Sequence, residues 1–153
     1  MKQLISEQFL PISIEEAWSF FSNPANLNEI TPESMSFKIL TELPDKVHEG
    51  LVIKYTVSPM LNIPLTWVTR INMVNEPYCF MDEQLKGPYK IWKHEHHFKS
   101  VNGGVMMKDI LNYDIGKGFL GKIAGFLFVN KKVEGIFTYR KAKMEKLFGV
   151  PVQ

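Results

Sequence analysis

The sequence of 153 residues lacks several features that would assign it to a large protein class. No apolar run is long enough for a signal peptide or a membrane span, so we expect a cytoplasmic protein without membrane insertion. The single cysteine, Cys79, excludes an internal disulfide. A formal net charge of +2 is too small to indicate a nucleic-acid partner. No serine or cysteine stands in a pattern typical of an activated nucleophile.

A glycine-rich segment, Gly116–Lys122, contains two incomplete phosphate-binding patterns. G-x-x-x-x-G-K requires Ser or Thr next, but Ile123 follows. G-x-G-x-x-G requires a strand–helix–strand unit, and here no strand pattern follows the helix. We therefore expect a turn into the last helix, and neither a nucleotide nor another cofactor.

What is present is the composition of an ordinary globular chain, 45% hydrophobic and 22% charged, which predicts one domain over residues 1–153. Residues 2–10 read as a strand. Ser13 and Glu16 then form a capping box that begins a helix. A second short helix begins at Asn23-Pro24 and stops before Thr31-Pro32.

Alternating segments separated by turn residues predict a run of further strands. They cover about residues 34–41, 50–58, 65–75, 77–86, 89–99 and 103–114. Short connections favour antiparallel neighbours. From residue 120 to 148 the period becomes helical, with one wide apolar face. That face comprises Ile123, Phe126, Leu127, Val133, Ile136, Phe137, Met144 and Leu147.

This order of elements predicts an α+β fold in which a curved antiparallel sheet of about seven strands wraps a long C-terminal helix. Two short helices follow the first strand. Because only the long helix can cover the apolar face of the sheet, we expect a cavity between the two.

Residues 92–98 are the most informative segment, because their alternation mixes large aromatic side chains with imidazoles on one face. That face carries Trp92, His94, His96 and Phe98. Ligand pockets are mostly apolar with a few placed polar groups, so this composition indicates a pocket lining rather than a plain core.

The chain resembles the START-like, polyketide-cyclase superfamily (SRPBCC), whose helix-grip fold is shared with the birch pollen allergen. More narrowly, it is similar to a bacterial, cell-division-inhibitor-like, ligand-binding branch. The residues that carry this resemblance are Phe80, Asp82, Gln84, Gly87-Pro88-Tyr89, Trp92, His94, His96, Phe98, Asp109, Tyr113, Phe137 and Tyr139-Arg140. The resemblance implies a cavity protein and brings no known substrate with it.

The inward strand faces, the polar residues of this run and the apolar helix face together give the predicted ligand-binding set. It comprises Tyr55, Trp67, Gln84, Trp92, His94, His96, Phe98, Asp109, Tyr113, Ile123, Phe126 and Phe137.

Three of these residues, His94, His96 and Asp109, are also candidate catalytic groups for acid–base chemistry, and Asp82 could extend their network. His-x-His on a strand presents two imidazoles to one metal, with Asp109 as a third ligand. Only two ligands have clear spacing, however, so we expect hydrogen bonding without a metal.

Three functions compete. We favour a binding protein for a small lipophilic or aromatic molecule over an enzyme of the cyclase, dehydratase or isomerase kind, and over a protein-interaction module. The apolar loop 58–64 covers either the cavity or a partner, and we expect a monomer or weak dimer. The basic residues of the last helix, Arg140 among them, read as a solvated surface.

Overall fold

The computed structural model describes residues 1–59, 62–116 and 125–150. In chain order its elements are β1 (Lys2–Leu10), α1 (Ile14–Phe21), the 3₁₀ turns η1 (Pro24–Asn28) and η2 (Glu33–Met35), β2 (Lys38–Ile39), β3 (Val52–Val57), β4 (Leu65–Asn75), β5 (Cys79–Lys86), β6 (Ile91–Val101), β7 (Gly104–Asp114) and α3 (Gly125–Phe148).

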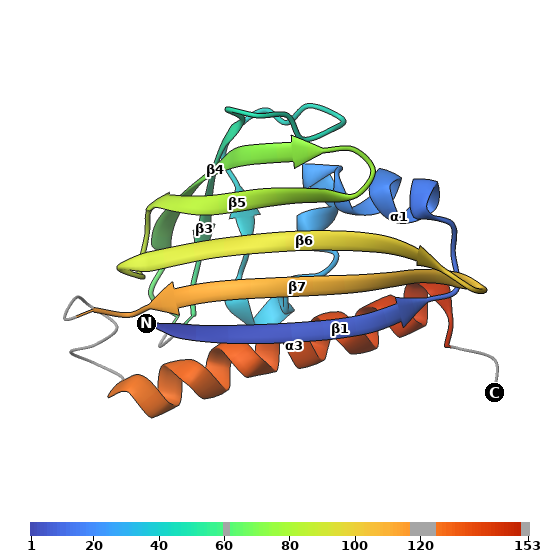
Figure 1. Cartoon of the computed structure of the whole chain (residues 1–153). Helices are drawn as coiled ribbons and strands as arrows, with labels where there is room; N and C mark the ends of the chain where they lie inside the picture. The colour runs from blue at the N-terminus through green and yellow to red at the C-terminus, as the bar shows by residue number, and fades with distance from the viewer. Residues whose placement is uncertain (60–61, 117–124, 151–153) are drawn as a thin grey trace.

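The strands form a seven-stranded antiparallel sheet in the order β1-β7-β6-β5-β4-β3-β2. Consecutive strands from β2 to β7 are neighbours, as short turns require, and β1 pairs with β7 over its whole length. Figure 1 shows the curved sheet with α3 running along its β1 side. The α+β helix-grip architecture predicted from the sequence is confirmed.

Helix α1 begins as the sequence predicts. The Ser13 side chain accepts a hydrogen bond from the Glu16 backbone, and the Glu16 carboxylate accepts one from the Ser13 backbone. The buried face of α1 includes Trp18, whose ring makes edge contacts with Phe80 and Phe98 of the sheet. The capping box therefore fixes the helix that covers one end of the concave face.

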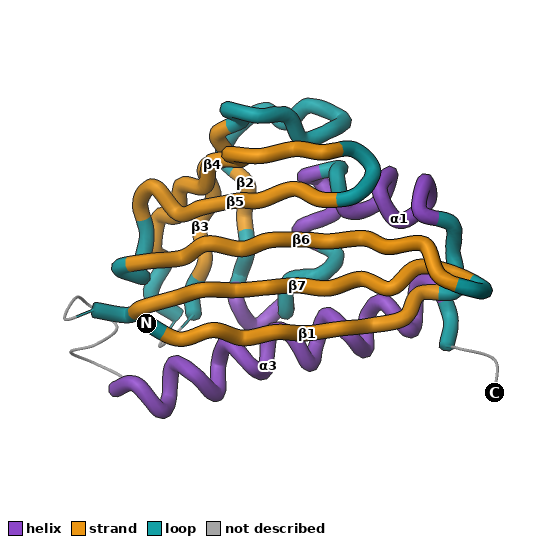
Figure 2. Tube along the Cα trace, in the orientation of Figure 1, coloured by secondary structure: helices purple, strands orange, loops and turns teal. Residues whose placement is uncertain are grey.

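The segment between α1 and β3 departs from the prediction (Figure 2). The second short helix is the 3₁₀ turn η1, and the predicted strand 34–41 is reduced to the two residues of β2. Ser36 has a φ of 46°, in the left-handed region, so no strand can run through it. This segment is held by tertiary hydrogen bonds, such as that from the Ser58 amide to the Met35 carbonyl.

Helix α3 buries a stripe narrower than the sequence predicts. Val129, Val133, Phe137 and Met144 are buried, whereas Leu127 and Leu147, at 78% and 44% exposure, face outward. Among the described residues, no helix is both long and apolar enough to cross a membrane. The predicted glycine-rich turn before α3 lies outside the described residues.

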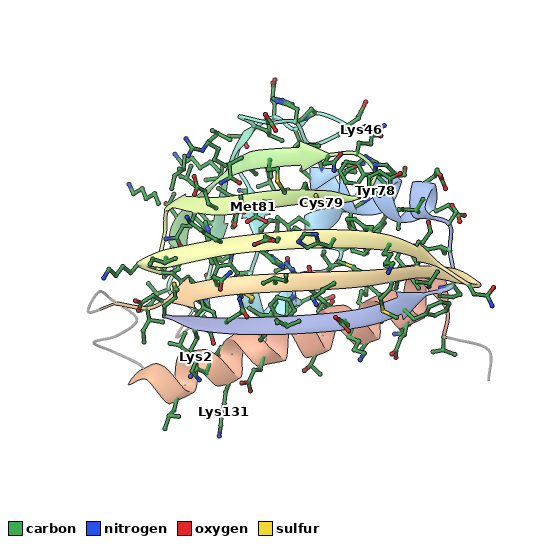
Figure 3. The ribbon with its side chains drawn as sticks, in the orientation of Figure 1. Lys2, Lys46, Tyr78, Cys79, Met81 and Lys131 are labelled. Carbon is green, nitrogen blue, oxygen red and sulfur yellow. The ribbon has the colours of Figure 1, made fainter. Side chains whose placement is uncertain are left out.

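The two faces of the sheet differ as the alternation predicts. On β5, Phe80 is buried and lies towards the core, while its neighbours Cys79 and Met81, labelled in Figure 3, belong to the outer face. The same alternation on β6 turns Lys93 outward and buries His94.

Candidate functional site

A cavity of ≈ 130 Å³ lies between the concave face of the sheet, the segment of η1 and η2, and the middle of α3. Most of its lining is aromatic or aliphatic. The aromatic residues of the lining are Phe20, Phe21, Phe37, Tyr55, Trp67, Phe80, Trp92 and Phe137.

The aromatic part of the lining is organised by strand register. Tyr55 of β3 stands opposite Trp67 of β4, and the two rings stack with centroids 5.8 Å apart. Trp92 of β6 meets Trp67 edge to face at 5.0 Å. The hydroxyls of Tyr55 and Thr69 share a hydrogen bond of 3.0 Å, and burial raises the pKa of Tyr55. These contacts hold the three rings together in one part of the lining.

The polar part of the site comes from three adjacent strands. Register places Asp82 of β5 opposite His94 of β6, and His96 of β6 opposite Asp109 of β7. All four side chains point to the concave face. His94, His96 and Asp109 are only 3%, 8% and 6% exposed. Two imidazoles and two carboxyl groups are therefore packed together in the buried interior.

Each imidazole lies between the two carboxyl groups. His94 Nε2 is 3.0 Å from Asp109 Oδ1, and His96 Nε2 is 3.1 Å from Asp82 Oδ2. The remaining pairs are His96 Nδ1 to Asp109 Oδ1 at 2.9 Å and His94 Nδ1 to Asp82 Oδ2 at 4.0 Å. His96 Nδ1 and Asp109 Oδ1 therefore form an ion pair when the imidazole is charged. The ring centroids of His94 and His96 are 3.9 Å apart.

The two imidazoles differ in protonation. Burial lowers the pKa of His94, and the neighbouring His96 lowers it further, which outweighs the contacts with Asp109 and Asp82. Burial also opposes charge on His96, but hydrogen bonds to Asp109 and Asp82 prevail and raise its pKa to about 9. Burial likewise opposes charge on Asp109, yet hydrogen bonds from both histidines hold its pKa below the usual range. The cluster thus combines a charged His96 with a neutral His94.

Arg140 of α3 also lines the cavity. Its Nε donates a 3.2 Å hydrogen bond to the Ile30 carbonyl, and its guanidinium lies 5.7 Å from the centre of the Phe137 ring. Burial lowers the pKa of Arg140, against the attraction of Asp109 and Asp82. Within the described part of the chain, no carboxylate lies within ion-pair distance of this guanidinium. The helix therefore contributes a cation to the cavity.

The structure brings six of the predicted ligand-binding residues to the cavity lining. They are Tyr55, Trp67, Trp92, His94, His96 and Phe137. Whether they contact a ligand stays a prediction.

The other predicted residues lie elsewhere. Gln84 is bonded to the backbone of Tyr89, and Phe98 packs among the rings of the core. Asp109, on β7, lies beside the two imidazoles, and the Tyr113 hydroxyl donates to Asn130 of α3 at 2.7 Å.

Two predicted ligand contacts and part of the loop 58–64 are not covered by the described residues. Ile123 and the side chain of Phe126 lie outside the described residues, as does the centre of the loop 58–64. In the described part of that loop, Ser58 is buried while Ile63 and Pro64 are exposed. The choice between a cover for the cavity and a partner contact stays open as a prediction.

The sequence reading missed Arg140 and the segment of η1 and η2, which supplies Leu27, Ile30 and Met35 to the lining. For Arg140 a signal existed: it stands three residues after Phe137, so both belong to one face of the helix. For the 3₁₀ segment no periodic signal was available.

No family model matches the chain, and no curated protein matches it. Solved structures do resemble it. A protein from Chromobacterium violaceum has a TM-score of 0.73 at 10% identity, with 97% of this chain and 98% of that chain covered. Ara h 8.0201 gives 0.60 at 15% identity, covering 95% and 98%. A nucleoside-diphosphate sugar epimerase from Corynebacterium glutamicum gives 0.68 at 20% identity, covering 94% of this chain but 28% of that one. At these identities, the likeness shows a shared helix-grip fold alone.

Proposed function

We propose that the chain binds a small molecule with a flat apolar body and one acceptor or anionic oxygen in the cavity. The observation that carries this proposal is the composition of the lining. It combines the aromatic rings of Tyr55, Trp67 and Trp92 with the cationic side chain of Arg140. An apolar cavity of about 150 Å³ takes up benzene. The volume of ≈ 130 Å³ therefore favours a compact, single-ring ligand.

The apolar body would lie against the stacked rings. Aromatic side chains bury a large area at little cost in conformational entropy, and ring pairs prefer stacked or edge-to-face contact. Tyr55, Trp67 and Trp92 already adopt both arrangements with one another. Phe98 and Tyr113 would support this surface from behind without touching the ligand, whereas Ile123 and Phe126 remain proposed contacts.

The oxygen would be bound by Arg140. Its Nε is committed to the Ile30 carbonyl, which fixes the side chain, while no hydrogen bond within the described residues engages its Nη groups. A guanidinium with free N–H groups suits a carboxylate or carbonyl oxygen. The buried N–H of Trp67 has no partner in the described part of the chain and offers a second donor.

The order of elements and the helix-grip fold support placing residues 1–153 in the START-like superfamily as one ligand-binding domain. A fold hosts many functions, so the fold supports the proposal only in general terms. The ligand chemistry comes from the lining.

Benzoate and benzyl alcohol test the proposal, because they share a ring and differ in charge. We expect both to bind by calorimetry, with benzoate tighter by about 10-fold or more, since hydrogen bonds to a charged group contribute about 1.5–3 kcal/mol. Arg140→Met should abolish that preference. The exposed neighbour Lys141 provides the control, Lys141→Met, which should preserve it.

A second pair of variants tests the location. Ile136 lines the cavity from α3, so Ile136→Trp should fill it and weaken both ligands. Leu147→Trp, on an exposed part of the same helix, should leave binding unchanged. Equal binding to Ile136→Trp and wild type, or no binding of either compound, would overturn the proposal.

A further inference from the structure

Asp82, His94, His96 and Asp109 come from three neighbouring strands, and three of them line the cavity. Asp82 on β5 and the two histidines on β6 belong to the lining, whereas Asp109, on β7 at the other side of β6, does not. The two carboxyl groups therefore differ in position. One shares the cavity wall with the imidazoles, and the other supports the imidazoles from the far side.

Asp109 contacts one nitrogen of each imidazole. Its Oδ1 is 3.0 Å from His94 Nε2 and 2.9 Å from His96 Nδ1. The opposite nitrogens, His94 Nδ1 and His96 Nε2, are those that face Asp82. A histidine that binds a metal through one nitrogen generally has its other nitrogen held by a carboxylate or carbonyl. Asp109 occupies that supporting position for both rings at once.

His94 Nδ1 and Asp82 Oδ2 are two electron-pair donors that face each other without a hydrogen bond between them. When His94 donates its Nε2–H to Asp109, its Nδ1 carries a lone pair. That nitrogen faces Asp82 Oδ2 at 4.0 Å, beyond hydrogen-bond distance, and the His94 side chain is 4% exposed. A lone pair opposite a carboxylate oxygen is unfavourable unless a cation lies between them.

We propose that Asp82, His94 and His96 form a binding site for a divalent first-row transition-metal ion. One ligand atom from each residue lies within 4.8 Å of the other two. Ligands around tetrahedral zinc are about 3.3 Å apart, given metal bonds of about 2.0–2.1 Å. The distances of 3.1 Å and 4.0 Å from Asp82 Oδ2 bracket that value, so the ligand atoms are close to the spacing that a bound ion requires. Two imidazoles and a carboxylate suit zinc, iron, cobalt or nickel.

The charges of the site suit such an ion. The negative charges of Asp82 and Asp109 balance a divalent cation. The positive charge of Arg140 then remains unbalanced and can attract an anionic oxygen into the cavity. Coordination positions not filled by the three side chains would open to the cavity that these residues line. The ion would compete with the proton on His96 Nε2, as metals generally do at imidazoles.

The test uses Co²⁺ alone, so its outcome is independent of the proposed organic ligand. Wild-type protein stripped with a chelator should bind one equivalent of Co²⁺ and develop a visible d–d absorption band. Asp82→Asn and His96→Gln should each abolish this band. Asp109→Asn should weaken binding by about 10–100-fold, as expected for a supporting carboxylate.

His97 supplies the matched control. It stands next to His96 on β6 but faces outward, where its Nε2 is 2.9 Å from Glu95 Oε2. His97→Gln should retain the Co²⁺ band. Absence of one-equivalent binding in the wild type would overturn the proposal. So would a band that survives Asp82→Asn and His96→Gln but is lost in His97→Gln.

Should the variants fail to fold, imidazole ¹⁵N chemical shifts of the wild type during Zn²⁺ titration give the answer. We expect His94 Nδ1 and His96 Nε2 to shift at one equivalent. Unchanged shifts at these two nitrogens would equally overturn the site.

Discussion

Gln84 fixes the turn between β5 and β6 through both ends of its side-chain amide. Its Nε2 donates to the Tyr89 carbonyl at 2.6 Å, and its Oε1 accepts from the Tyr89 amide at 3.3 Å. The amide lies where a β-carbon on Gly87 would stand, so a side chain there would overlap Gln84 Oε1. Glycine at position 87 therefore leaves the room that Gln84 needs to reach the turn backbone. Both residues belong to the segment that carries the family resemblance. The sequence predicts Gln84 as a ligand-binding residue, whereas the structure shows it bonded to the turn backbone.

This arrangement predicts a non-additive pair of substitutions. Gly87→Ala should displace Gln84 and cost about 1–2 kcal/mol, the contribution of one or two hydrogen bonds. In a Gln84→Ala background, the same change should cost little, because the obstructing amide is gone. Urea unfolding of the four proteins measures this as a double-mutant cycle.

Gly135 is the control for that cycle. It lies on α3 with nothing within 4 Å of its would-be β-carbon, so Gly135→Ala should stabilise the helix by up to about 1 kcal/mol. An equal cost of Gly87→Ala in both backgrounds would show that the turn backbone, and not Gln84, demands glycine.

The sequence locates some site residues and misses others for physical reasons. Strict alternation along β6 places His94 and His96 on one face, because a strand has a period of two. Asp82 and Asp109 join them through register between strands, which pairing fixes and composition does not reveal. Arg140 is harder to recognise, since a long charged side chain can cover apolar surface while its head reaches a cavity.

At the scale of elements, α3 is the helix that closes the cavity, and Phe137 lies at its centre. Phe137 is 7% exposed, and its ring centroid lies 5.5 Å from that of His94. Phe137→Ala should cost about 3 kcal/mol, at the low end for a buried phenylalanine, because the ring already borders empty space.

Leu147→Ala is the matched control on the same helix. At 44% exposure, Leu147 buries little apolar area, and its truncation should cost below about 1 kcal/mol. Guanidinium unfolding of both variants gives the comparison. Similar costs for the two would mean that α3 packs on the sheet through a different face.

Elements with a periodic pattern are those that the sequence predicts. β1, α1, β3–β7 and the described part of α3 follow from alternation, capping or helical spacing. The segment from η1 to β2 follows none of these. Its conformation depends on contacts with distant residues, such as the Ser58 amide donating to the Met35 carbonyl at 2.6 Å. Local sequence carries little information on such contacts, and this segment forms one wall of the cavity.

For the whole molecule, the two sides of the cavity differ in how firmly their backbones are held. β7 is paired along its length with β1 and β6, whereas η1 and η2 lie outside the sheet ladder. Amides of β7 should therefore exchange only on global unfolding, and those of η1 and η2 through local opening. If opening of η1 and η2 removes one wall of the cavity, a bound ligand must suppress both this local opening and global unfolding.

Hydrogen exchange with and without benzoate tests this coupling. At a free ligand concentration of about nine times Kd, exchange in β7, η1 and η2 should slow by about tenfold, because the ligand binds only the closed form. The β6–β7 turn at Asn102-Gly103 is the internal control, since it is not among the residues that line the cavity and its exchange should be unchanged. Slowing in β7 without slowing in η1 and η2 would mean that this segment opens without disturbing the ligand. The ligand would then be held by the sheet and α3 alone.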